Sequence, residues 1–156
     1  MSLLSPARAQ PLFIPHYSKS TRPMHTWDQL HDTSLLLTRA PEMAEDYQRH
    51  CKNVLCSYPT LSDYIRQKVV ANMTGMHLTV NRFPYDVEPD VSHFVLWNLN
   101  EEPIQNCSHF VHLCFDPQFF HVCIRENQPH HRSVKDIQHY HVFVKRKAWD
   151  PTVPKL

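Results

Sequence analysis

Glycine is almost absent from this chain: its 156 residues include one, Gly75. Nucleotide-binding loops of the GxGxxG and GxxxxGK[ST] types need several glycines at fixed offsets, because the backbone must approach phosphate closely. The composition therefore excludes a Rossmann fingerprint and a P-loop. Turns must use the 13 prolines and the asparagine and aspartate residues instead.

Long hydrophobic runs and a strong excess of charge are also lacking. Histidine or a charged residue interrupts every apolar stretch before the ~18 residues that a membrane-spanning helix needs. The formal net charge is +1, and the basic cluster Lys145-Arg146-Lys147 is short. We therefore expect neither a membrane nor a nucleic-acid partner, and the sequence leaves the oligomeric state open.

Paired cysteine motifs are missing as well. The five cysteines share no CxxC spacing and follow no secretory signal, which favours reduced thiols and a cytoplasmic location. A mitochondrial location is the alternative, because residues 1–24 carry basic residues and no acid. Four prolines would break a presequence helix there, so we expect a flexible tail over residues 1–25. A single domain over 26–148 and a C-terminal tail over 149–156 complete the expected organisation.

The remaining pattern predicts helices followed by strands. Thr26-Trp27-Asp28-Gln29 has the form of a capping box, apolar residues at helical spacing predict a helix over 41–56, and Thr60 can cap a second one that ends at Gly75. Alternation with a period of two predicts strands from Met76 onward. Their expected ranges are 76–80, 92–98, 109–115, 119–124 and 139–145, with 109–124 forming a hairpin. The predicted class is α+β, with N-terminal helices packed on one face of a mainly antiparallel sheet.

Alternation along each strand sorts the side chains onto two faces. One face is nearly all apolar, and we expect it to pack on the two helices. Each of these strands from 92 onward brings histidine to the second face. Those histidines are His93, His112, His121, His139 and His141.

Several motifs lie in an order that is typical of one family. Asn81-Arg82-Phe83-Pro84-Tyr85 precedes His93-Phe94-Val95-Leu96-Trp97, and Asn127-Gln128-Pro129, Ser133-Val134 and His139-Tyr140-His141-Val142 follow. In these elements the chain resembles the fungal N-acetylglucosamine-induced protein family, an uncharacterised domain family, over roughly residues 27–146. The resemblance implies no known reaction.

A second resemblance is to the histidine-triad nucleotide hydrolases. It rests on Asn127, Ser133-Val134 and His139-x-His141. The resemblance implies that His141 is the nucleophile, His139 its supporting histidine, and Asn127 and Ser133 phosphate ligands. Phe143 replaces the third histidine, the usual glycines are missing, and the predicted hairpin occupies the place of a helix.

Two sets of residues are candidates for chemistry. His139 and His141 would point the same way about 7 Å apart, which suits acid–base work on a phosphoester or metal coordination. The alternative is a pair of partly buried, hydrogen-bonded sheet residues. The predicted hairpin would place His112, Cys114, His121 and Cys123 on one face, a geometry for two or three zinc ligands. Otherwise the cysteines are small buried hydrophobes.

These candidates lead to one expectation of function and one alternative. We expect a small polar or phosphorylated ligand, a sugar or nucleotide derivative, on the histidine-lined face, with phosphoester hydrolysis as a further step. The expected ligand-binding residues are Asn81, Arg82, Tyr85, His93, Trp97, Asn127 and Ser133. The alternative is a non-enzymatic metal-binding or protein-interaction module.

Overall fold

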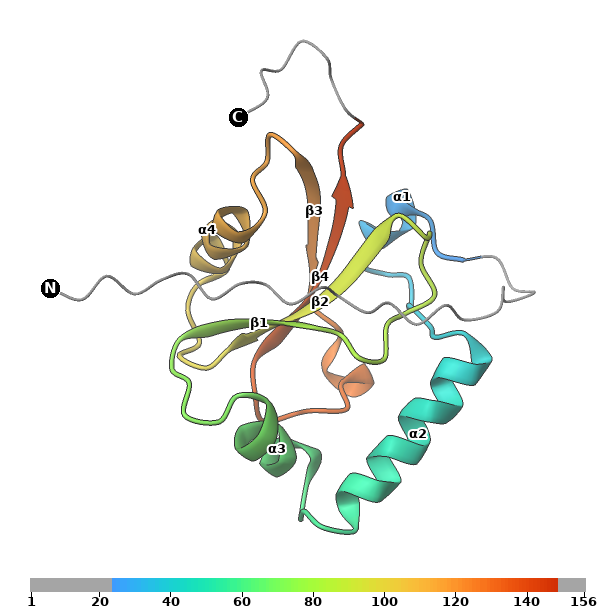
Figure 1. Cartoon of the computed structure of the whole chain (residues 1–156), viewed down its shortest axis with the longest axis vertical. Coiled ribbons are helices and arrows are strands. Elements are labelled where there is room, and N and C mark those ends of the chain that lie inside the picture. The colour runs from blue at the N-terminus through green and yellow to red at the C-terminus, as the bar shows by residue number, and fades with distance from the viewer. Residues whose placement is uncertain (1–23, 149–156) are drawn as a thin grey trace, which may run out of the picture.

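The computed structural model describes residues 24–148 (Figure 1). The predicted tails over 1–25 and 149–156, with the presequence-like pattern, lie outside this range except for Met24 and His25. None of the helices within it is long and apolar enough to cross a membrane.

The core of the fold is a four-stranded antiparallel sheet with the strand order β1-β2-β4-β3. Its strands are β1 (Met76–Val80), β2 (Val91–Asn98), β3 (Phe120–Arg125) and β4 (His139–Arg146). The two central strands, β2 and β4, are buried along most of their length, as their Val, Phe and Leu content favours. The predicted α+β class with an antiparallel sheet is confirmed.

Three helices precede the sheet in the chain. They are α1 (Trp27–Leu30), α2 (Pro41–Leu55) and α3 (Leu61–Tyr64), which continues as the π-helical segment η1 (Ile65–Val69). Both reciprocal bonds of the predicted capping box join Thr26 and Gln29, and Thr60 caps α3. Gly75 has a φ of 78°, the left-handed conformation that glycine adopts without strain, and it directly precedes β1.

The prediction of a hairpin over 109–124 is wrong in its first half. Ile104–Cys114 forms a helix, α4, which starts directly after Pro103, and only β3 is extended. The buried Cys107 and Val111 lie four residues apart, and Phe110 adds the helical stripe between them. The apolar residues over 109–115 fit both an alternation with a period of two residues and a helical period of 3.6 residues. The sequence therefore suggested a strand where a helix forms.

Helices cover both faces of the sheet. The apolar face, with Phe94, Leu96 and Val142, packs against α4. The histidine-bearing face packs against α1 through Phe143 and against α3 and η1 through Trp97. Figure 1 shows α4 and α1 on opposite sides of the sheet. The N-terminal helices therefore do share one face, but it is the histidine-bearing face and not the apolar one that the sequence suggested.

Candidate functional site

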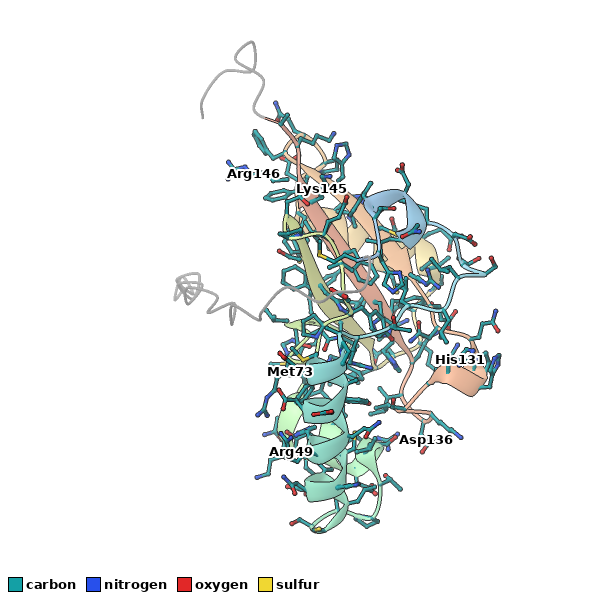
Figure 2. The ribbon with its side chains drawn as sticks, turned by 90° about the vertical axis from the view of Figure 1, so that its right-hand side faces the viewer. Arg49, Met73, His131, Asp136, Lys145 and Arg146 are labelled. Atoms are coloured by element: carbon teal, nitrogen blue, oxygen red, sulfur yellow. The ribbon has the colours of Figure 1, made fainter. Side chains whose placement is uncertain are left out.

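A cavity of about 210 Å³ lies over the histidine-bearing face. Its walls come from α2, α3, η1, the loop between β1 and β2, and the loop between β3 and β4. Figure 2 shows α2 and the loop labelled at His131 and Asp136 on two sides of the lower end of the sheet. Of the predicted site residues, the following line this cavity: Asn81, Arg82, Tyr85, Trp97, Asn127, Ser133, His139 and His141.

His93 does not line the cavity but belongs to a buried chain of hydrogen bonds beside it. The backbone N–H of Tyr85 donates to Nδ1 of His93 at 3.1 Å, so the proton of a neutral His93 is on Nε2. Nε2 lies 2.9 Å from Nδ1 of His141, which must accept that proton's hydrogen bond. The proton of His141 is then on its own Nε2. One fixed backbone donor thus sets the tautomers of both histidines.

The chain of hydrogen bonds ends at Asn127. The structure places its amide nitrogen Nδ2 3.0 Å from Nε2 of His141 and 2.8 Å from the hydroxyl oxygen of Tyr85. Because Nε2 of His141 is protonated, we assign the amide oxygen to this position, where it accepts from both neighbours. Asn81 shapes the other end, since its side-chain oxygen accepts from the backbone N–H of Phe83 at 2.9 Å. The chain therefore ties both cavity loops to the sheet.

Burial keeps this pair of histidines neutral. His93 and His141 are 5% and 6% exposed. Burial, together with the neighbouring histidine, lowers the pKa of His93 well below 6.5, and burial above all lowers the pKa of His141 to about 3. At neutral pH both rings therefore act as uncharged donors and acceptors.

His139 has a different environment. Its Nδ1 lies 2.8 Å from the carbonyl oxygen of Ile137, which can only accept, so Nδ1 carries the proton and Nε2 carries a lone pair. No hydrogen bond from the described part of the chain reaches this Nε2. Within residues 24–148, Nε of Arg125 is the one fully buried side-chain nitrogen or oxygen that lacks a hydrogen-bond partner. Since Nε2 of His139 also lacks a partner, it is not fully buried. It is accessible from the cavity that His139 lines. Burial lowers the pKa of His139, and the Ile137 carbonyl opposes this shift.

Three arginines line the cavity, and none of the aspartates or glutamates in residues 24–148 does. Arg39 is held in place, because its Nε donates to the Phe83 carbonyl at 2.8 Å and its guanidinium carbon lies 4.0 Å from the Tyr47 ring centroid. Its two Nη groups have no hydrogen-bond partner within residues 24–148. Arg82 is exposed and lies over the Phe83 ring, while Arg132 donates to Glu126 at 2.7 Å. Arg39 and Arg82 therefore bring positive charge to the cavity, while the charge of Arg132 is paired with that of Glu126.

Rings form the wall opposite the sheet. Tyr47, His50, Tyr64 and Phe83 are linked by successive ring contacts of 4.9 to 5.5 Å between centroids. None of these four residues was among the predicted site residues, and neither was Arg39 or Arg132. Three of them belong to α2 and α3, where helical spacing alone indicates packing. A signal for Arg39 was its place two residues before Pro41, the first residue of α2.

The predicted metal ligands do not come together. His112 and Cys114 lie exposed on α4, on the apolar side of the sheet, whereas Cys123 is buried on the opposite side against the α1 cluster. His121 is exposed on β3. The cause is the replacement of the expected hairpin strand by a helix. Between residues 24 and 148, no group of three or more His, Cys, Asp and Glu is placed to hold a metal ion.

One comparison with known proteins shows a similar fold, and another shows the family. The structure titled "Crystal Structure of HTC1" is similar with a TM-score of 0.56 and 23% sequence identity, over 77% of this chain and 84% of that chain, which shows the fold alone. No curated protein matches. A family model described as "Protein of unknown function (DUF3605)" matches residues 26–145. Since this match covers most of the chain, the protein belongs to that uncharacterised family.

Proposed function

We propose that the cavity binds a small polar ligand that carries a phosphoryl group. The observation that supports this proposal is the set of three arginines, Arg39, Arg82 and Arg132, among lining residues that, within residues 24–148, include no carboxylate. Arg39 and Arg82 carry most of the argument, because Arg132 is already paired with Glu126. A guanidinium presents paired N–H groups that match phosphate geometry, and such charge-assisted bonds are about twice as strong as neutral ones. Arg39 is already oriented by Phe83 and Tyr47, so binding costs it little conformational entropy.

The rest of the cavity suits the remainder of such a ligand. The wall of rings around Phe83 offers apolar faces for a sugar or a base, while Asn127 and Ser133 offer polar groups. A phosphorylated sugar or nucleotide derivative combines these features. The resemblances to the N-acetylglucosamine-induced family and to the histidine-triad hydrolases stay predictions.

Calorimetric titration tests the proposal. Inorganic phosphate, glucose 6-phosphate and adenosine 5′-monophosphate should bind, and glucose and adenosine should bind at least tenfold more weakly. Arg39→Met should weaken phosphate binding by about tenfold or more, the equivalent of one charge-assisted hydrogen bond.

Arg49→Met is the matched control. Arg49 lies on α2 outside the cavity, where its side chain is 65% exposed and pairs with Asp46. Circular dichroism should show that both variants are folded. Equal phosphate affinity in the wild type and Arg39→Met, or no binding of any phosphorylated probe, would refute the proposal.

A further inference from the structure

We infer that the cavity also hydrolyses its phosphoester ligand, and that Nε2 of His139 accepts the proton of the attacking water. This inference rests on the proposed function. It concerns a reaction rather than binding, and it assigns the reacting nitrogen to a different histidine from the one that the histidine-triad resemblance implies.

The assignment follows from the hydrogen bonds of the three buried histidines. Both ring nitrogens of His93 are occupied, by the Tyr85 backbone and by His141. Both ring nitrogens of His141 are occupied too, by His93 and by Asn127. His139 keeps one accessible nitrogen with a lone pair. His93 and His141 are therefore positioning residues, and His139 is the group that can meet a ligand.

The surroundings of His139 fit a base. The Ile137 carbonyl holds the proton on Nδ1, so Nε2 is the basic nitrogen, and the same carbonyl stabilises the imidazolium that forms when Nε2 takes a proton. Its ring lies 5.1 Å from the Trp97 ring and 5.9 Å from the His141 ring, which limits its rotation. Because His139 is held in one tautomer and one orientation, it is preorganised to accept a proton on Nε2.

His50 and His131 also line the cavity, but within residues 24–148 neither ring has a hydrogen bond that fixes its tautomer as the Ile137 carbonyl does for His139. His50 lies on the ring wall, and His131 is exposed, with 4.0 Å between its ring centroid and that of His130. The lining tyrosines offer hydroxyl groups and no ring nitrogen. The lining arginines remain charged and can stabilise the negative charge that develops on the phosphoryl oxygens.

The reaction balances without a further reactant. The oxygen of water forms a bond to phosphorus as its proton passes to Nε2 of His139. The bond from phosphorus to the ester oxygen breaks, and the electron pair leaves with that oxygen. The imidazolium then releases its proton to the departing alkoxide or to solvent, which regenerates neutral His139. The products are an alcohol and inorganic phosphate.

The test uses p-nitrophenyl phosphate, whose leaving group departs without protonation and so isolates the role of the base. The wild-type chain should release p-nitrophenolate, and His139→Gln should release it about 100-fold or more slowly, the range for loss of a general base. Phosphate affinity should stay within threefold. His109→Gln, an exposed histidine on α4, is the control and should leave the rate unchanged.

The pH profile adds a second readout. The wild-type rate should rise with pH to a plateau as His139 loses its proton, and this rise should vanish in the residual rate of His139→Gln.

Phosphate binding without hydrolysis by the wild type would overturn the inference but leave the proposed function. An acid-labile phosphohistidine trapped on His139 would also overturn it, since the nitrogen would then attack phosphorus itself. Failure of all phosphate binding would overturn both.

Discussion

At the scale of single residues, the three buried histidines have two different roles. His93 and His141 are hydrogen-bonded to each other and to the two cavity loops, so all their ring nitrogens have partners. His139 has one partner, the Ile137 carbonyl, and its other ring nitrogen stays accessible. Burial on their common sheet face, the histidine-bearing one that α1, α3 and η1 cover, lowers the pKa of all three. Neutrality is thus a property of the face, and the hydrogen bonds decide what each ring can do.

The depressed pKa values predict that stability falls with acid. A histidine whose folded pKa is lowered binds its proton mainly in the unfolded state, so stability is complete above pH 6.5 and is lost as pH falls below it. With the pKa of His141 at about 3, this residue alone should cost about 2 kcal/mol between pH 7 and pH 5. Urea unfolding at both pH values measures the loss. A free energy of unfolding that is equal at pH 5 and pH 7 would contradict the assigned neutrality.

Replacement of His93 should destabilise the fold. His93→Leu leaves the buried N–H of Tyr85 and Nδ1 of His141 without their partner, at an expected cost of about 2–4 kcal/mol. Chemical denaturation measures this, with the exposed His109→Leu as the control for a histidine-to-leucine change. A loss below about 0.5 kcal/mol would show that the hydrogen-bond chain is not intact in solution.

At the scale of elements, the sequence predicted well those helices and strands that are determined by residues within the element itself. The capping box, α2, β1 and β4 lie where spacing and capping residues indicated, with ends shifted by at most a residue or so. α4 was missed because His109, Val111, Leu113 and Phe115 alternate, while the contacts that favour a helix, Cys107 and Val111 against the sheet, are tertiary. The sequence of a single helix likewise does not show which face of the sheet that helix covers, because this depends on contacts between distant segments.

The attachment of α1 to the sheet gives a prediction at this scale. Arg125, on β3 and 5% exposed, donates to the carbonyl of Asp32 at 2.8 Å and also to the carbonyls of Leu30 and Leu35. Arg125→Leu removes the donor for carbonyls at the end of α1, so we expect a loss of about 2–4 kcal/mol.

Hydrogen exchange distinguishes this local effect from a general one. Amides of residues 27–37 should exchange faster in Arg125→Leu, while those of α4, on the other face, should change much less. Arg146→Leu, an exposed arginine at the end of β4, is the control. Uniform acceleration over all elements would contradict a specific role of Arg125 in holding α1.

At the scale of the whole molecule, the cavity joins residues from α2, α3, η1, three strands and three loops, one of which carries Arg39 just before α2. The sequence could group Asn127, His139 and His141 because they lie in ordered motifs and on predicted strand faces. It could not place Arg39 or Tyr47 opposite them, because that placement depends on how α2 lies over the sheet. The functional roles of all these residues stay predictions until they are measured.

A bound ligand should stabilise the whole fold, because its contacts span these elements. Phosphate at 100 times its dissociation constant should raise the free energy of unfolding by about 2.7 kcal/mol, and the tenfold weaker binding expected for Arg39→Met should reduce this gain to about 1.4 kcal/mol or less at the same concentration. Chemical denaturation with and without phosphate measures the difference, with Arg49→Met as the control. A gain that is the same in Arg39→Met would indicate a nonspecific salt effect.

The bond between His93 and His141 joins positions 48 residues apart, on strands that are neighbours in the sheet but not in the chain. During synthesis, β1 and β2 leave the ribosome long before β4, and β2 waits with one edge unpaired. Insertion of β4 between β2 and β3 then completes the sheet and creates the cavity in the same event. The growing chain therefore has no complete cavity until β4 has emerged, and the unpaired edge of β2 is where we expect premature association between nascent chains to begin.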